Sequence, residues 1–128
     1  MSTPARQYHY QGVHFLRKTL SYTTENTQVA VGVLPAGAQI LKPMSGVSIT
    51  TVFNDSGTDT IDIGTSGTAD LYGAALAATS LDFVPIAAAV TGLMAADTTI
   101  YARYNGQNNN ASAGVAEVII AYIPDTDG

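Results

Sequence analysis

The chain has 128 residues, of which 46% are hydrophobic and only 12% are charged, and it carries a net charge of −5. This length fits a single domain, the negative charge argues against nucleic acid as a partner, and the lack of cysteine excludes disulfides and thiol chemistry. The N-terminus lacks the apolar core of a secretion signal. Because the longest apolar stretch is shorter than the roughly 20 residues that span a bilayer, we expect no membrane contact.

The first twelve residues have no sustained period of 2 or 3.6, which predicts an arm rather than an element of the fold. Tyr8 and Tyr10 give this arm two large amphipathic side chains with which it can dock on another surface. We therefore predict an N-terminal arm over residues 1–12, a β domain over 13–124 and a polar tail over 125–128.

Short β-type runs begin at Val13. In residues 13–22 two consecutive cations interrupt the alternation of side chains, which predicts a strand that bends or bulges in its middle. The next predicted strand carries three valines on one face, Val29, Val31 and Val33. Residues 34–37, Leu-Pro-Ala-Gly, predict a type II turn at its end.

Two further runs, residues 47–53 and 58–63, alternate in the same way and are rich in β-branched side chains. A dense turn cluster at 54–57 separates them. Two strands joined by a tight turn predict a β-hairpin.

Residues 70–81 are the one segment in which a helix competes with a strand. Four side chains share a face at close to the helical spacing, and alanine, the best helix former, supplies three of them: Leu71, Ala74, Ala75 and Ala78. Gly73 opposes a helix, so we predict a short helix or a helical turn. The strand predicted at 83–87 contains Pro85, which places it at a sheet edge or a bulge.

The last two predicted strands, 98–104 and 115–122, flank a loop rich in Asn, Gly, Ser and Ala. The final strand is apolar on both faces except at Glu117, so we expect it at the centre of a sheet. The chain thus contains seven or eight short strands and at most one helix, which is typical of an all-β sandwich or barrel.

Candidate chemical groups are few. The two histidines, His9 and His14, lack a committed third ligand for zinc, and the acidic cluster of Asp55, Asp59 and Asp62 lacks the ligand spacing of a calcium loop. Asp55 is better explained as a turn residue that accepts hydrogen bonds from nearby backbone, and Asp62 as a solvent-facing strand position. We therefore predict no metal and no cofactor.

Catalytic signatures are also missing, because the sequence contains no nucleophile elbow, phosphate loop or dinucleotide fingerprint. A pair of carboxylates of the glycosidase kind stays open, since Glu25 and Glu117 are the only glutamates and lie in a predicted turn and in the final strand. The five cations are too sparse for a nucleic-acid-binding stripe. We predict that the protein is not an enzyme.

Four stretches of the chain share a distinctive pattern of strands and turns. They are the Leu-Pro-Ala-Gly turn within 29–40, the Thr-rich strand ending in Phe-Asn within 47–54, the Ile-Asp-Ile-Gly-Thr strand within 60–66, and the Gly-x-Ala-x-Val strand that begins at Gly114. Together they resemble the small head decoration, or cementing, proteins of tailed bacteriophages. The resemblance covers residues 29–123 and contains no catalytic motif.

The resemblance implies a jelly-roll-like β-sandwich that binds the outer surface of an assembled capsid, with the major capsid protein as partner and with itself as a dimer or trimer. It places the protein in the virion after synthesis in the host cytoplasm. It also implies that the arm reaches the capsid or a neighbouring subunit through the candidate contact residues Arg6, Tyr8, His9 and Tyr10. The Ala-rich segment 70–78 departs from the family pattern, as an insertion would.

A second interpretation is a phage tail or fibre accessory domain, or a β-sandwich module that binds a host glycan. A sugar site needs aromatic platforms exposed on one face, and the chain has no tryptophan. We therefore favour a decoration protein over a glycan-binding module.

Overall fold

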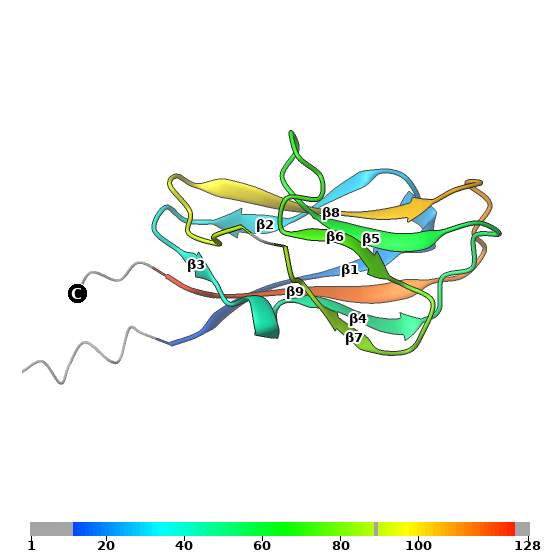
Figure 1. The fold of residues 1–128 in the computed structure, drawn as a ribbon, viewed down its shortest axis with the longest axis horizontal. Coiled ribbons are helices and arrows are strands. Elements are labelled where there is room, and N and C mark those ends of the chain that lie inside the picture. The colour runs from blue at the N-terminus through cyan, green and yellow to red at the C-terminus, as the bar shows by residue number, and fades with distance from the viewer. Residues whose placement is uncertain (1–11, 89, 125–128) are drawn as a thin grey trace, which may run out of the picture.

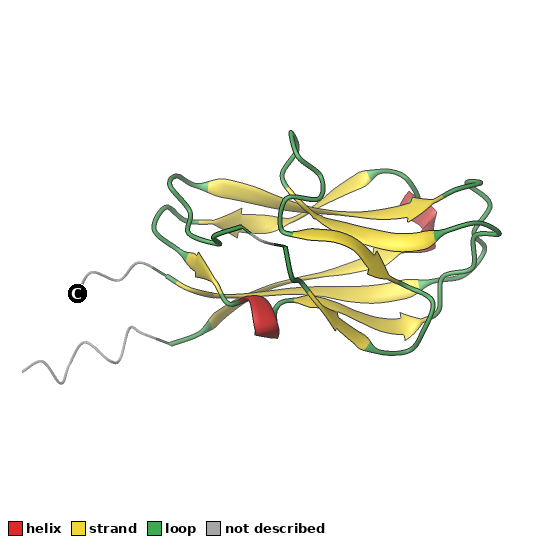
Figure 2. Ribbon diagram, in the orientation of Figure 1, coloured by secondary structure: helices red, strands yellow, loops and turns green. Residues whose placement is uncertain are grey.

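The computed structural model describes residues 12–88 and 90–124. These residues form nine β-strands and two single-turn 3-10 helices, which Figure 2 shows in yellow and red. In chain order they are β1 (His14–Ser21), η2 (Tyr22–Thr24), β2 (Gln28–Leu34), β3 (Gln39–Ile40), η3 (Lys42–Met44), β4 (Gly46–Thr51), β5 (Asp59–Gly64), β6 (Gly73–Ala77), β7 (Phe83–Pro85), β8 (Thr98–Gly106) and β9 (Val115–Ile123). Within the described ranges, no helix is long and apolar enough to cross a membrane.

The strands make two antiparallel sheets that face each other (Figure 1). The order is β1-β9-β4-β7 in one sheet, where β3 also pairs with β9, and β2-β8-β5-β6 in the other. Strands from the two ends of the chain pair with each other in order: β1 with β9, β2 with β8, β4 with β7 and β5 with β6. This is the topology of a jelly roll. The predicted jelly-roll-like β-sandwich is therefore confirmed, with the two-residue β3 beyond the seven or eight strands expected.

The core lies between the two sheets. β9 lies between β1 and β4, which confirms its predicted central position. Tyr104 of β8 and Phe53, which follows β4, are the two largest fully buried side chains, and their ring centroids are 4.3 Å apart. A buried aromatic pair of this kind contributes roughly 0.5–1.5 kcal/mol beyond the burial of its area.

The predicted hairpin between residues 47–53 and 58–63 is wrong. β4 and β5 lie in different sheets, so the connection between them crosses from one layer to the other. Phe53 is 1% exposed and its ring packs on Tyr104 of the other sheet. The chain has therefore already turned toward that sheet before the turn cluster begins. The turn residues at 54–57 therefore form a corner between layers, which local turn chemistry does not distinguish from a hairpin.

The helix predicted within 70–81 is also wrong. β6 occupies the centre of this segment and pairs with β5, with Ile61 opposite Leu76. Ala75 has a φ of 52° and donates its N–H to Asp62 Oδ1 at 2.7 Å, where the register shifts. Burial of Leu76 and pairing with β5 outweigh the helix propensity of alanine, which is less than about 1 kcal/mol per residue relative to most other residues.

Strand β1 is continuous, contrary to the bend predicted for it. It pairs with β9 at every position from His14, opposite Tyr122, to Ser21, opposite Val115. Arg17 donates a hydrogen bond to Glu117 on β9. The two cations that interrupt the alternation in the sequence therefore do not interrupt the pairing of β1 with β9.

A bulge lies instead in β2, where the register with β8 shifts between Ala30 and Gly32. It reverses the alternation, so that Leu34 is fully buried while Val33 is 54% exposed. The prediction that Val33 shares a face with the two preceding valines is therefore wrong.

Two local predictions at the sheet margins are confirmed. Gly37 has a φ of 84°, and Ala38 donates its N–H to the Pro35 carbonyl at 3.1 Å, as in a type II turn with glycine in the left-handed position. This turn begins one residue later than predicted. β7, which contains Pro85, is the outermost strand of its sheet, where a missing N–H costs no ladder hydrogen bond.

Candidate interaction surface

The β1-β9-β4-β7 sheet turns a regular face away from the core. On β9, buried side chains alternate with Val115, Glu117 and Ile119, which therefore point outward. Residues directly opposite these in the register share their face of the sheet, as do residues two positions further along the same strands. We call this surface the outer face and define it by Phe15, Arg17, Thr19, Gly46, Ser48, Thr50, Phe83, Pro85, Val115, Glu117 and Ile119.

The register arranges the outer face in rows across the sheet. One row contains Thr19, Glu117, Ser48 and Phe83. In the next row Gly46 lets β7 approach closely, because a Cβ there would lie 2.8 Å from Pro85 Cα and would overlap the Val84 carbonyl. β4 thus presents only small side chains, while the aromatic side chains Phe15 and Phe83 stand on the flanking strands β1 and β7.

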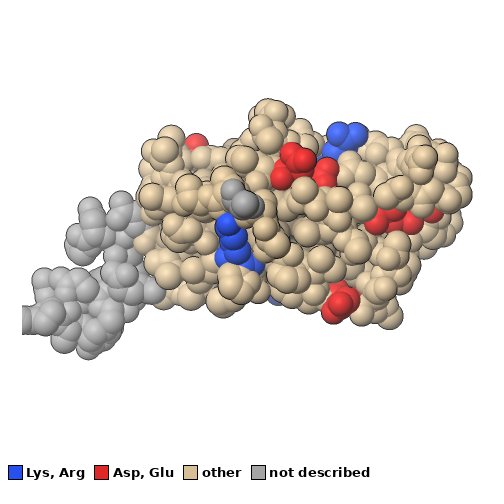
Figure 3. Space-filling model, viewed as in Figure 1, with Lys and Arg blue, Asp and Glu red and all other residues tan. Residues whose placement is uncertain are grey.

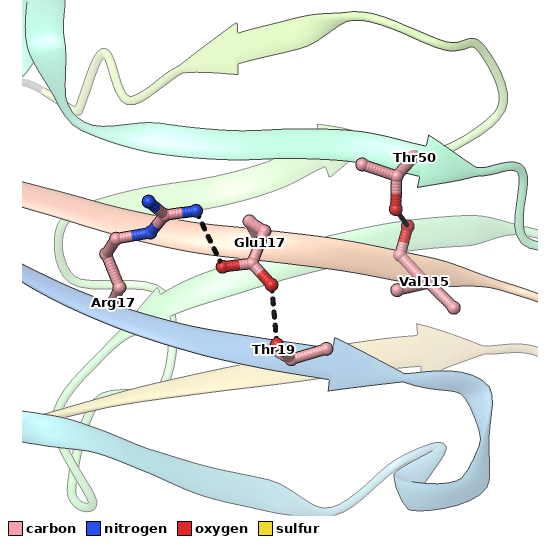
Figure 4. Close-up of polar contacts among 5 residues, drawn as sticks. All are labelled: Arg17, Thr19, Thr50, Val115 and Glu117. Carbon is pink, nitrogen blue, oxygen red and sulfur yellow. Dashed lines mark hydrogen bonds and ion pairs between the residues drawn. The ribbon is translucent and has the colours of Figure 1, made fainter.

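The two charges of the outer face cancel. Arg17 Nη2 lies 3.1 Å from Glu117 Oε1, and Thr19 donates its hydroxyl to Glu117 Oε2 (Figure 4). The hydrogen bond from Thr19, together with Arg17, lowers the pKa of Glu117 against the opposing effect of burial, so the carboxylate stays ionised and paired. The outer face is therefore electrically neutral on a chain whose net charge is −5.

Large apolar side chains are also exposed on the outer face. Phe15 is 52% and Phe83 38% exposed, and Val115 and Ile119 are partly exposed between them. A sheet face that meets only water normally carries polar side chains, whereas aromatic residues and few charges are typical of the centre of a protein interface. The composition favours contact with another protein surface.

The opposite sheet offers no comparable surface in the part of the chain that the structure describes. Val33 is the one large apolar side chain exposed on its strands, and its register partner on β8 is Thr99. Isolated apolar residues of this kind are ordinary on the surface of a domain. The contrast singles out the outer face as the candidate contact surface.

A separate, polar region, which we call the loop end, comprises residues 54–58 and 107–113 together with Glu25. It lies at the end of the sandwich away from the described chain ends (Figure 1). Asn54 Oδ1 accepts the Ser112 N–H at 2.8 Å, and Asp55 Oδ1 accepts the Gly57 N–H at 2.7 Å, which confirms the predicted turn role of Asp55. The first of these bonds joins the two loops to each other, and the second closes a turn within residues 54–58.

The candidate contact residues predicted from the sequence, Arg6, Tyr8, His9 and Tyr10, lie outside the described residues. His14, the other histidine, packs against Tyr122 with 5.6 Å between ring centroids. Residues 12–88 and 90–124 contain no group of three His, Cys, Asp or Glu side chains that could hold a metal ion.

The fold gives the two glutamates different partners. Glu117 lies on the outer face with Arg17 and Thr19, whereas Glu25 lies beside Asp55 at the loop end. Nothing in this arrangement brings them together as a carboxylate pair. The outer face was not predicted from the sequence, because the residues that form it come from four strands that only the pairing register aligns. The alternation of side chains in the final strand was the one sequence signal for this face.

The fold is similar to a chain of a solved structure described as "Cyanophage Pam1 capsid asymmetric unit". The two chains are 19% identical and superpose with a TM-score of 0.70, over 98% of this chain and 93% of the other. No protein-family model and no curated protein matches the sequence. At this identity the likeness shows a shared fold, and it extends over nearly the whole length of both chains.

Proposed function

We propose that this protein is a structural protein of a phage virion that binds the outer surface of the assembled capsid and cements neighbouring capsomers. The observation that carries the proposal is the neutral outer face, which is flanked by Phe15 and Phe83. The fold shared with a chain from a cyanophage capsid supports the same role. The partners in this proposal are the major capsid protein and further copies of this chain, as a dimer or a trimer.

A neutral face suits many weak contacts on a repeating shell. Burying an unpaired charge at an interface is costly, whereas Arg17 and Glu117 already compensate each other. Each contact can be weak by itself, because linked contacts on a symmetric lattice raise the effective concentration of the next one. Cementing of this kind needs no catalytic step and no cofactor, and we propose none.

We also propose that the arm adds contacts through Arg6, Tyr8, His9 and Tyr10. β1 begins at His14 and carries Phe15 on the outer face, so the preceding residues enter the fold at the flank of that face. The chain before Gly12 has a contour length of at most about 40 Å, which is enough to reach a neighbouring subunit.

Phe15→Ser tests the outer face, with Val33→Ser as a matched control. The two side chains are almost equally exposed, at 52% and 54%, and lie on the edge strands β1 and β2 of the two sheets. We expect Phe15→Ser to weaken co-sedimentation with undecorated capsid shells by about tenfold or more, as for an aromatic interface anchor. Val33→Ser should bind as the parent protein does, and both variants should keep the parent melting temperature.

The parent protein must first co-sediment with shells saturably and with fixed stoichiometry. Binding to host-surface glycans without binding to shells would overturn the proposal in favour of a tail, fibre or glycan-binding module. Equal losses of shell binding in the two serine variants would show that the outer face is not the contact surface.

The same assay tests the arm. Deleting residues 1–12 should reduce shell affinity and leave the melting temperature of the domain unchanged. Unchanged shell affinity after the deletion would refute the arm contact while leaving the outer-face contact standing.

A further inference from the structure

Two carboxyl groups, those of Glu25 and Asp55, meet at the loop end of the sandwich. Glu25 directly follows η2, and Asp55 lies in the connection between β4 and β5. Both approach Gly106 at the end of β8, because a Cβ at this position would overlap Glu25 Oε2 and lie 2.8 Å from Asp55 Oδ2. The missing side chain at position 106 is what gives the two carboxyl groups room to meet.

The hydrogen bonds around Asp55 identify it as the ionised member of the pair. Its carboxylate accepts the N–H groups of Gly57 at 2.7 Å, Asn108 at 3.1 Å and Asn110 at 3.2 Å. Backbone N–H donors stabilise a carboxylate relative to a protonated carboxyl group. Burial alone would raise the pKa of Asp55, but the neighbouring Glu25 carboxyl group and these backbone bonds outweigh it and hold that pKa well below its ordinary value.

Glu25 has fewer donors around it. Its Oε1 accepts the Ala111 N–H at 3.1 Å, whereas its Oε2 is buried and has no donor facing it. The neighbouring Asp55 carboxylate accepts hydrogen bonds but cannot donate one. A proton on Glu25 Oε2 supplies the missing donor. In agreement, burial, followed by the neighbouring Asp55 carboxylate, raises the pKa of Glu25 above its ordinary value of 4.5.

The other titratable groups at this corner also disfavour an ionised Glu25. Asp59 of β5 accepts the Asp55 N–H at 2.9 Å and the hydroxyl of Tyr104 from β8. Burial and the bond to Asp59 raise the pKa of Tyr104, so its hydroxyl stays neutral. No ion pair links Glu25 or Asp55 to a cation among the described residues. An ionised Glu25 would therefore face two carboxylates without a counter-charge.

We propose that Glu25 is protonated in the folded protein and donates its Oε2–H to Asp55, and that this pair is a pH-sensitive latch for the loop at 107–114. Glu25 holds the loop through Ala111, and Asp55 holds it through Asn108 and Asn110. The latch joins the turn after η2, the β4–β5 connection and the β8–β9 loop. It is independent of the proposed role on a capsid.

The latch is closed over a bounded range of pH. Because folding raises the pKa of Glu25, the stability that this residue contributes is complete below its ordinary value of 4.5 and is lost as the pH rises through the folded pKa. The pKa of Asp55 is lowered instead, so its contribution is present above its ordinary value of 3.8 and is lost as the pH falls through the folded pKa. Raising the pH through the Glu25 transition therefore opens the latch.

Because the chain has only two glutamates, their carboxyl signals test the latch directly. In protein labelled with carbon-13 at the glutamate carboxyl carbon, we expect Glu25 to titrate above pH 4.5 and Glu117 below it. The amide signals of Asn108 and Ala111 should shift with the Glu25 midpoint. Their protection from hydrogen exchange, corrected for the intrinsic rate, should fall by up to about tenfold for each unit by which the Glu25 pKa is raised.

Glu25→Gln supplies a latch that does not titrate, because its amide can donate to Asp55 and accept from Ala111 at any pH. The protection of the loop amides should then lose this transition, whereas the matched variant Glu117→Gln should keep it. A Glu25 signal that titrates at or below pH 4.5 overturns the shared proton. A raised Glu25 midpoint that the Ala111 amide does not follow overturns the latch. The Glu25 titration and the response of the Ala111 amide are both measured on the parent protein, so they test the proposal even where a variant does not fold.

Discussion

The outer face and the loop end use their polar groups in opposite ways. On the outer face one ion pair, between Arg17 and Glu117, compensates itself and leaves a neutral surface with exposed aromatic side chains. At the loop end the carboxyl groups turn inward, and Asp55 is only 5% exposed with backbone N–H groups as partners. The first region has side chains left for another molecule, whereas the groups of the second are engaged by its own loops.

This difference separates binding from folding. Charged side chains are few in the view of Figure 3, and the one ion pair among the described residues, Arg17 with Glu117, is exposed and so adds little stability. Changes on the outer face should therefore alter binding with little effect on folding. Changes at the loop end should do the reverse, because its side chains hold separate segments of the chain together.

Gly106→Ala has the largest expected effect. Its Cβ would overlap Glu25 Oε2 and lie 2.8 Å from Asp55 Oδ2, so the carboxyl pair would have to move. We expect the free energy of unfolding, measured by chemical denaturation, to fall by about 2–3 kcal/mol, as for an overpacked site.

Gly67→Ala is the matched control for this substitution. No heavy atom lies within 4 Å of a Cβ at position 67, so its free energy of unfolding should stay within about 0.5 kcal/mol of the parent value. Equal free energies for the two alanine variants would mean that the corner around Gly106 can relax, and the contrast between the two regions would be lost.

Arg17→Ala has a smaller expected effect on folding than Gly106→Ala. The Arg17 side chain is 63% exposed, so the free energy of unfolding should fall by less than about 1 kcal/mol. The variant leaves Glu117 as an uncompensated charge on the outer face, so co-sedimentation with shells should weaken. Adding Glu117→Gln restores neutrality and should recover binding. If Arg17→Ala lowered stability and left shell binding intact, the outer face would serve folding rather than binding, contrary to the comparison drawn above.

Several features of the fold could be predicted because they depend on neighbouring side chains. The apolar character of both faces of β9 indicated its central position, and Pro85 indicated the edge position of β7. The turn role of Asp55 followed from its place in the turn cluster at 54–57. Periodicity and turn chemistry act within a few residues, so a single sequence reveals them.

Predictions failed where a distant partner outweighed a local preference. The Ala-rich segment became β6 because β5 offers a ladder and a buried position for Leu76. The cluster at 54–57 became a corner because Phe53 is held in the core by Tyr104. In both places a contact with another layer decided the conformation of residues whose own preferences were weak.

By itself the sequence determined that the chain forms short strands with a sparsely charged surface and a final strand that lies centrally in its sheet, because composition and side-chain period are local properties. Only the tertiary structure decided which strands share a sheet and which polar groups meet. Arg17 and Glu117 are 100 positions apart, and Ala111 and Glu25 are 86 apart. Such contacts depend on pairing register and on the path of the chain between layers, since a shift of one residue would turn each side chain to the opposite face.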